Sequence, residues 1–223
     1  PIIEYNGTKY LRIPVKTHVI TKDDSIVDVV SMYAREIVKE NDIVFISEKA
    51  VAITQGRAYP LEEIKPRPLA RLLSKYVTKT PSGIGLGIPE TMEMALRECG
   101  VLRILFAAVV SFFGKLFGRK GDFYRIAGYK ASSIDGPTPN TLPPYNRYVV
   151  LGPENPDQVA KSISDSIKAE VAIVDINDLG GNILGTSKSS LDRKTLVGIL
   201  RDNPLGQCCE QTPMGIIRSA EEQ

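Results

Sequence analysis

The first part of the chain alternates between apolar and polar residues from Ile2 to Lys16, with Asn6-Gly7 in the middle. Alternation with a period of two predicts β-strands, and Asn-Gly is a pair that two-residue hairpin turns favour. The polar segment from Thr21 to Asp24 then has the residues that begin a helix, and apolar residues follow at helical spacing as far as Asn41-Asp42. The pattern therefore predicts a β-hairpin followed by a helix.

The remaining chain continues with short apolar runs, which predict buried strands, and with three- and four-residue apolar repeats, which predict helices. The predicted strands are Ile43 to Ser47, Ala50 to Thr54, Tyr148 to Leu151, Val171 to Asp175 and Met214 to Arg218. The predicted helices are Leu69 to Thr78, a helix from Pro89, Val101 to Phe117, Asn155 to Ile167 and Leu191 to Arg201, and the Gly- and Pro-rich stretch 118–146 is predicted to be a loop. Because this order lacks a regular strand–helix–strand alternation, we expect an α+β fold with mixed sheets and packed helices.

The composition is that of a folded protein of ordinary type. The 223 residues are 43% hydrophobic, enough for a sizeable core, and we expect residues 1–223 to form a single domain, with a subdivision near residues 80–120 as the alternative. A net charge of +2 without a long basic block gives no indication of nucleic-acid binding. Three cysteines, two of them adjacent, form no disulfide framework, so we expect a reducing, cytoplasmic location.

The segment Val101 to Phe117 is the most apolar part of the chain. Arg103 and Lys115 interrupt it, and its uncharged run is about half of the roughly 20 residues that a membrane span needs. Its large apolar residues repeat at helical spacing, so we expect an amphipathic helix packed against the core or against a second subunit. A membrane-surface helix is the alternative, and the lack of a rich Lys and Arg face argues against it. We therefore expect no membrane partner.

One candidate for chemistry is the end of the apolar run that begins at Val171. Asp175, Asn177 and Asp178 follow this run and precede Gly180-Gly181. Carboxylates at the end of a strand, beside glycines that let a ligand approach, are a common arrangement for metals that prefer oxygen ligands. If the strand continues, Asp175 and Asn177 lie on the same side of it. The alternative is a turn in which these side chains bond only local amides.

Two other segments carry charged residues in a loop-like context. The stretch 127–138 is long, polar and rich in small residues, and it contains Asp135 before Gly136-Pro137; long loops of this kind are often functional, although Asp135 could be a turn former. The stretch 47–57 carries Lys49 and Arg57, which could contact phosphate or could lie on a solvated hairpin edge. The one histidine, His18, stands beside an apolar segment, where packing is commoner than catalysis.

In order and spacing, these segments resemble the coenzyme F420-0:gamma-glutamyl ligase family. Its pattern is K-x-V-S-K-A-E-G-R, then A-N-A-G-V-D-x-S-N, then S-D-T-x-G-R, and G-Q…P near the end. The matching segments are Lys49 to Arg57, Ala127-Gly128 with Ile134-Asp135 and Thr138, Ile176 to Gly181, and Gly206 to Pro213. In addition, Thr17-His18-Val19 stands ahead of Asp23-Asp24, where the family has a nucleotide-contacting segment. The resemblance covers about Lys16 to Arg218.

The resemblance implies a homodimeric, intertwined α+β fold and an amide ligation of glutamate through an acyl phosphate. It also implies GTP, with ATP as the alternative, as phosphoryl donor and Mg²⁺ or Mn²⁺ as the metal. Asp135 would be a metal ligand, Asn177 stands where the family has its second metal aspartate, and Asp178 stands at a threonine position, so Asp175 or Asp178 could supply the missing carboxylate. The positions that would contact the nucleotide are Thr17, His18, Glu48, Lys49, Thr138, Gly206, Gln207, Glu210 and Gln211.

Three departures from the family pattern bear on activity. Ile53 replaces the lysine of the motif, Gln55 its glutamate and Asn177 its aspartate. Loss of a lysine beside phosphate removes a charge that stabilises a transferring phosphoryl group, and Lys16, Lys49 and Lys130 are the candidates to replace it. The sequence therefore supports a divergent acid–amino acid ligase, with a non-catalytic nucleotide- and metal-binding homologue as the alternative. A dimeric scaffold without a small ligand is the third interpretation.

Overall fold

The computed structural model describes residues 1–77, 84–119, 121–139, 141–177, 180–206 and 210–220. Its residues form two compact units, the first made of Pro1–Gly56 with Pro153–Gln223 and the second of Arg57–Gly152. Each unit has an apolar core of its own and mixes helices with strands. The α+β prediction is thus confirmed, and the interpretation of the chain as a single ligase-like domain stays a prediction.

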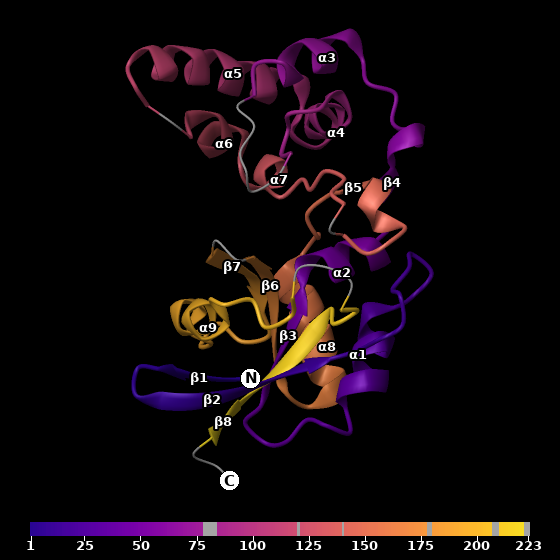
Figure 1. Cartoon of the computed structure of the whole chain (residues 1–223), viewed down its shortest axis with the longest axis vertical. Helices are drawn as coiled ribbons and strands as arrows, with labels where there is room; N and C mark the ends of the chain where they lie inside the picture. Colours follow the sequence, from indigo (N-terminus) through magenta and orange to yellow (C-terminus); the bar gives the residue numbers. More distant parts are fainter. Residues whose placement is uncertain (78–83, 120, 140, 178–179, 207–209, 221–223) are drawn as a thin grey trace. The chain divides into compact units, whose positions relative to one another are not determined.

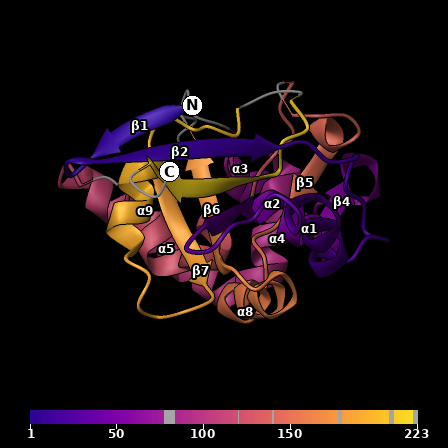
Figure 2. The ribbon, with the colours of Figure 1, turned by 90° about the horizontal axis from the view of Figure 1, so that it is seen from below.

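The first unit is built on a six-stranded sheet in the order β1-β2-β8-β3-β6-β7, in which only β3 and β6 are parallel. Its strands are β1 (Ile2–Tyr5), β2 (Thr8–Val15), β3 (Ile43–Ser47), β6 (Glu170–Asn177), β7 (Gly180–Thr186) and β8 (Met214–Ser219). The predicted hairpin is confirmed, because β1 and β2 pair across Asn6 and Gly7, which both have positive φ as a tight hairpin turn requires. The last strand, β8, lies between β2 and β3, and Figure 2 shows it beside β2 near the C-terminus.

Helices cover the two faces of this sheet (Figure 1). Helix α9 (Arg193–Leu200) packs on β7 and β1, whereas α8 (Pro156–Ile167) packs on β6 and β7 and also contacts α1 (Ile26–Ala34). Successive side chains along a strand point to opposite faces of the sheet. Phe45 therefore belongs to the core under α9, and its neighbours Val44 and Ile46 are buried on the other face. The core under α9 contains Phe45, Ala172, Val174, Ile183, Leu196, Ile199, Leu200 and Ile217.

Three predicted elements of the first unit need correction. The segment predicted as a strand from Ala50 to Thr54 is helix α2 (Glu48–Thr54), because a short, wholly buried apolar run has no periodicity that separates strand from helix. Helix α1 begins after Ser25 and ends at Ala34, well before Asn41. Strand β6 runs two residues beyond Asp175, and β7, which the sequence pattern did not predict, pairs with it.

A buried ion pair explains why α1 stops early. The chain turns after Ala34 so that the Asp42 carboxylate, 1% exposed, accepts hydrogen bonds from the Lys39 amide at 2.8 Å and from Arg218 Nε at 2.9 Å. These bonds attach the segment after α1 to β8, and the hydrogen bonds with Asp42 raise the pKa of Arg218. A charged pair of this kind is costly to leave half-satisfied, so it fixes the segment between α1 and β3.

The second unit is mainly helical. Its helices are α3 (Pro68–Ser74), α4 (Pro89–Cys99), α5 (Val101–Leu116), α6 (Asp122–Ala127) and α7 (Tyr129–Ser132), with 3-10 turns at Leu61–Glu63 and Tyr145–Arg147. A two-stranded sheet pairs β4 (Ala58–Pro60) with β5 (Tyr148–Val150). Helices α6 and α7 are short and lie in the stretch predicted as a loop, where Gly121 and Gly128 bound them and mask their periodicity.

Glu93 is a charged residue inside this unit, at 2% exposure. Its carboxylate accepts hydrogen bonds from Arg67 Nη2 at 2.9 Å and from Arg97 Nε at 2.9 Å. Burial raises the pKa of Glu93, but the hydrogen bonds from the two arginines outweigh this effect and hold the pKa below its usual value. The ion pair joins the start of α3 to α4.

Helix α5 confirms the predicted helix from Val101 but not its orientation. The face that packs against the core carries Ile104, Ala107 and Gly114, whereas the predicted large apolar stripe is mostly exposed. Of the two expected partners of this stripe, the core of the chain is therefore wrong, and a second subunit stays a prediction. Among the described residues no single helix is long and apolar enough to cross a membrane, although α4 and α5 pass that test together as a pair bent by 116°.

Candidate functional site

Several candidate residues come together at one end of the six-stranded sheet. Val15, Met214, Ile46 and Ile173 pair in one row across β2, β8, β3 and β6. The residues that extend beyond this row therefore share one end of the sheet, although they are far apart in the sequence. They are Lys16 and Thr17 after β2, residues 210–213 before β8, Glu48 and Lys49 after β3, and Asp175 and Asn177 on the last part of β6.

Backbone hydrogen bonds hold these segments against one another. The amide of Thr17 donates to the Gln211 carbonyl at 3.0 Å, and the amide of Ser47 donates to the Pro213 carbonyl at 2.8 Å. The segment before β8 is thus bonded on one side to the residues after β2 and on the other to the end of β3. Two of the predicted nucleotide-contacting residues, Thr17 and Gln211, are direct backbone partners.

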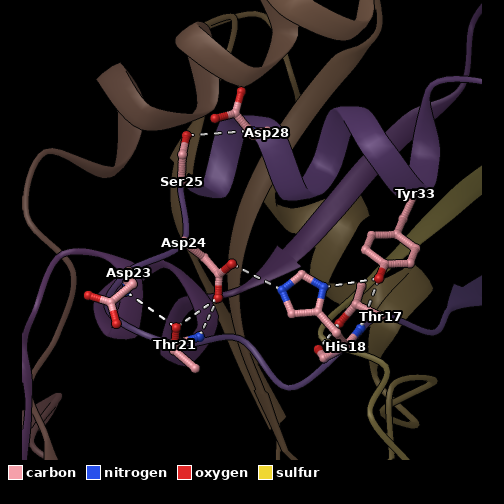
Figure 3. Close-up of polar contacts among 8 residues, drawn as sticks. All are labelled: Thr17, His18, Thr21, Asp23, Asp24, Ser25, Asp28 and Tyr33. Carbon is pink, nitrogen blue, oxygen red and sulfur yellow. Dashed lines mark hydrogen bonds and ion pairs between the residues drawn. The ribbon is translucent and has the colours of Figure 1, made fainter.

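The loop after β2 is organised by the His18 side chain (Figure 3). The ring lies between Asp24 and Tyr33, with His18 Nε2 at 3.1 Å from Asp24 Oδ1 and His18 Nδ1 at 3.0 Å from the Tyr33 hydroxyl. The amide of His18 also donates to that hydroxyl at 3.2 Å. These partners assign the proton of a neutral ring to Nε2, facing the carboxylate, and leave Nδ1 to accept from the Tyr33 hydroxyl. His18 is exposed and hydrogen-bonded on both nitrogens, so the expectation of a packing role is wrong.

Asp24 connects the His18 ring to a tight turn. Its Oδ2 accepts from the Thr21 amide at 2.7 Å and from the Thr21 hydroxyl at 3.0 Å, and these bonds are visible in Figure 3. The backbone hydrogen bond from Thr21, helped by the side chain of His18, holds the pKa of Asp24 below its usual value. Asp24 therefore stays ionised at neutral pH and orients His18. Ser25 follows as the N-cap of α1, with its hydroxyl accepting from the Asp28 amide at 3.4 Å.

The sequence did not single out Asp24 and Tyr33 as partners of His18. Tyr33 lies on α1, 15 residues further along the chain, and no local spacing indicates that its hydroxyl meets the ring. The Asp23-Asp24 pair was noted only as the residues that follow Thr17-His18-Val19, where the family has a nucleotide-contacting segment. The structure distinguishes the two, because Asp24 faces His18 while Asp23 contributes its amide to the Thr21 hydroxyl.

Ile53 and Gln55, the two departures from the family pattern at the end of α2, both have structural roles. Ile53 is 6% exposed and belongs to the buried face that also contains Ala50, Val51 and Ala52. Gln55 forms a reciprocal pair with the backbone of Glu154, in which Gln55 Nε2 donates to the carbonyl at 2.9 Å and Gln55 Oε1 accepts from the amide at 2.8 Å. Only an amide side chain can donate and accept in this way. A glutamate at position 55 would lose the donor.

Residues 203–206 and 210–212, which precede β8, are hydrogen-bonded among themselves. Asn203 Nδ2 donates to the Gly206 carbonyl at 2.9 Å, and the Thr212 hydroxyl donates to the Leu205 carbonyl. Gly206 has a φ of +81°, a backbone conformation that favours glycine. A Cβ at this position would also lie 2.6 Å from the Glu210 carboxyl carbon. This places Glu210 beside Gly206, while Gln207 lies outside the described residues.

The predicted metal-binding turn is partly described. Because β6 continues through Asn177, its pleat places Asp175 and Asn177 on the same face, as the sequence analysis expected. Asp178 lies outside the described residues. In the part of the chain that the structure describes, no three His, Cys, Asp or Glu side chains are grouped closely enough to hold a metal ion.

Asp135 and Thr138 belong to the second unit. Asp135 is exposed and exchanges two backbone hydrogen bonds with Val150, at 2.8 and 2.9 Å, so it extends the small sheet of that unit. Thr138 shares a hydroxyl hydrogen bond of 2.8 Å with Thr141. Arg57, also in this unit, donates to the Gly152 carbonyl and to Glu98, at 2.6 and 2.7 Å. A metal site shared by Asp135 and the β6 residues stays a prediction.

Comparison with known proteins adds one positive finding. The model of the family described as F420-0:gamma-glutamyl ligase matches residues 14–184 of this chain. The matched range begins within β2 and ends within β7, and it includes the His18 loop, α2 and the Asp175 strand. A search of curated proteins found no match to the chain.

Proposed function

This chain belongs to the F420-0:gamma-glutamyl ligase family, and we propose that it is a nucleotide- and divalent-metal-dependent ligase that joins a carboxylate to a glutamate-like amino acid. The observation that carries the proposal is the convergence, at one end of the sheet, of four segments that match the family's nucleotide- and metal-contacting positions. As the resemblance implies, we also propose that the ligase works as a homodimer with GTP or ATP.

The proposed reaction has two steps. The carboxylate of the acid attacks the γ-phosphorus of the nucleotide, which forms an acyl phosphate and releases the nucleoside diphosphate. The amino group then attacks the acyl carbon, and inorganic phosphate leaves with the electrons of the broken C–O bond while the amine loses a proton. Such transfers depend on positioning and on positive charge around the phosphoryl group. Lys16 and Lys49, which both follow strands at the site end of the sheet, supply that charge in place of the lysine lost at position 53.

The residues of β6 suit a metal that also binds phosphate. Mg²⁺ is commonly held by one or two carboxylates together with phosphate oxygens, so it does not need a cluster of three protein carboxylates. Asp175 and Asn177 offer one carboxylate and one amide oxygen on the same face of β6, and Asp135 and Asp178 are the further ligands that we propose. When bound, Mg²⁺ or Mn²⁺ would neutralise phosphate charge.

The proposal is tested by replacing Lys16 and Lys49, with Lys9 as the control. Lys16 follows β2 at the site end, whereas Lys9 lies at the other end of β2, opposite Glu4. We expect Lys16→Ala and Lys49→Ala each to weaken binding of GTP or ATP in the presence of Mg²⁺ about tenfold, the size of one charge-assisted phosphate contact. Lys9→Ala is the matched control and should leave the affinity unchanged. Equal affinities for all three variants, measured by calorimetry, would reject the site.

The non-catalytic homologue remains the second candidate, and one observation favours it. Two positions that carry a charged residue in the family have structural roles in this chain. Ile53 is buried on α2, and Gln55 is hydrogen-bonded to the Glu154 backbone. A protein that only binds would tolerate these changes more readily than a ligase. The two functions are distinguished by nucleotide turnover against a panel of carboxylic acids and amino acids. A ligase releases phosphate only when an acid and an amine are both supplied, whereas the binding protein releases none.

A further inference from the structure

Helix α5 carries its largest apolar side chains on the face that points away from the core. The contact with the rest of the second unit is made by Ile104, Ala107 and Gly114. Gly114 is needed there because a Cβ would collide with the Asp122 carboxylate. The opposite side, which we term the α5 apolar face, consists of Leu102, Phe106, Val109, Phe113, Leu116 and Phe117, all more than half exposed. An ordinary surface helix has the reverse arrangement, with large residues inside.

The α5 apolar face is one continuous stripe. From Leu102 to Leu116 its members follow at intervals of four, three, four and three residues, and each residue turns an α-helix by about 100°. The stripe is therefore straight and about 20 Å long at roughly 1.5 Å per residue. Leu102 and Phe117, at its two ends, are 84% and 81% exposed. Contiguous exposed apolar surface of this kind marks an interaction site.

The charged residues in the sequence of this segment have a single sign, although Arg103 donates to the Ile126 carbonyl of α6. Residues 101–121 include no Asp or Glu, while Arg103, Lys115, Arg119 and Lys120 are basic. The next acid, Asp122, is buried and is paired with Arg119 at 3.2 Å and with Arg125 at 2.8 Å. An anionic surface would meet these basic residues with opposite charge, which the same segment of a second copy, with no acid, would not supply.

A further aromatic residue lies beside the end of the stripe. Lys115 Nζ donates to the Tyr76 carbonyl at 3.5 Å, and the Tyr76 side chain is 73% exposed. Aromatic rings with a polar tip, next to lysines whose stems lie along apolar surface, are the groups that settle at a membrane–water boundary.

We propose that the α5 apolar face binds the surface of a bilayer that contains anionic lipid, with the helix parallel to the membrane plane. Large apolar residues on one side of a helix and a length too short for a span are properties of an interfacial helix. The exposed apolar face, with basic and no acidic residues in 101–121, outweighs the lack of a rich Lys and Arg face that argued against a membrane surface. The proposal departs from the expectation that no membrane is involved, because the structure exposes the residues that were expected to be covered. It does not depend on the ligase activity.

The test measures co-sedimentation of the full chain with vesicles. We expect binding to vesicles of phosphatidylcholine with about one-third phosphatidylglycerol, and binding several-fold weaker to phosphatidylcholine alone. Phe113→Glu and Leu116→Glu should each reduce binding at least tenfold, because each removes an apolar side chain that the bilayer would bury and adds a negative charge. Met32→Glu is the matched control, since Met32 is 70% exposed on α1, and it should bind like the unaltered protein.

A second pair of variants tests the charges. Lys115→Gln should weaken binding to the anionic vesicles about fivefold, the effect of one basic residue at such a surface, while Lys161→Gln, on the exposed side of α8, should not. Absence of binding to anionic vesicles would overturn the proposal. The proposal would also be overturned if light scattering shows a dimer that Phe113→Glu dissociates and the unaltered chain does not bind the vesicles. In that case a second copy covers the face.

Discussion

Replacing Ile53 by lysine restores a family residue, and we expect it to damage the fold. Ile53 is 6% exposed on the buried face of α2, so the substitution removes about 1.5–3 kcal/mol of apolar burial. It also places an ammonium group among Ala50, Val51 and Ala52, although the flexible stem lets the charge move part of the way to solvent. Together these effects should cost about 3–5 kcal/mol, a large fraction of the roughly 5–15 kcal/mol that holds a domain folded.

The assay is urea unfolding at neutral pH, with Ile53→Met as the matched control. For a slope of about 2 kcal/mol per molar urea, Ile53→Lys should lower the midpoint by about 2 M, and Ile53→Met should lower it by less than about 1 M because it conserves volume and adds no charge. Nucleotide affinity should not rise in either variant. An unchanged midpoint with tighter nucleotide binding would show that position 53 faces the ligand and that the placement of this helix face is wrong.

Two further predictions concern Gln55 and Glu93. Gln55→Glu should destabilise the protein by about 1 kcal/mol in urea unfolding, because the carboxylate loses the donor to the Glu154 carbonyl; an unchanged midpoint would contradict that pairing. The pKa of Glu93 is lowered in the folded state, so its contribution to stability is present above the ordinary glutamate pKa of about 4.3 and is lost as pH falls through the lower folded value. Glu93→Gln should therefore weaken the dependence of stability on pH between about 5 and 3, and a dependence equal to that of the unaltered protein would argue against the pairing with Arg67 and Arg97.

Much of the fold follows from local pattern. The hairpin at Asn6-Gly7, the strand after Asp42, the helices α8 and α9 and the last strand were all predictable, because alternation, capping residues and helical spacing are properties of neighbouring residues. The errors fall where local pattern is silent. In helix α2 the apolar residues Ala50 to Ile53 are consecutive and all buried, so they reveal no period, and β7 begins with two glycines, which strands disfavour.

The candidate site was predictable as a set of residues but not as a place. Nothing in the sequence indicates that β8 inserts between β2 and β3, and it is this insertion that brings Gln211 to Thr17. The partners of His18 were equally hidden, since the Tyr33 hydroxyl reaches the ring from the side of a helix. The resemblance named candidate residues but not their positions in space, because these depend on contacts between residues far apart in the sequence.

Taken together, the departures from the family pattern change where the positive charge of the candidate site lies. In the family the motif lysine stands near the end of the α2 segment, where this chain has Ile53 in the core and Gln55 bonded to the start of the α8 region. A lysine at position 53 would now have to leave a packed face, so the fold itself opposes a return to the family residue. Lys16 and Lys49 lie beyond the ends of β2 and β3, where Lys16 is exposed and Lys49 is half-buried. The two lysines that we propose for the phosphate therefore lie beyond the strand ends and not at position 53.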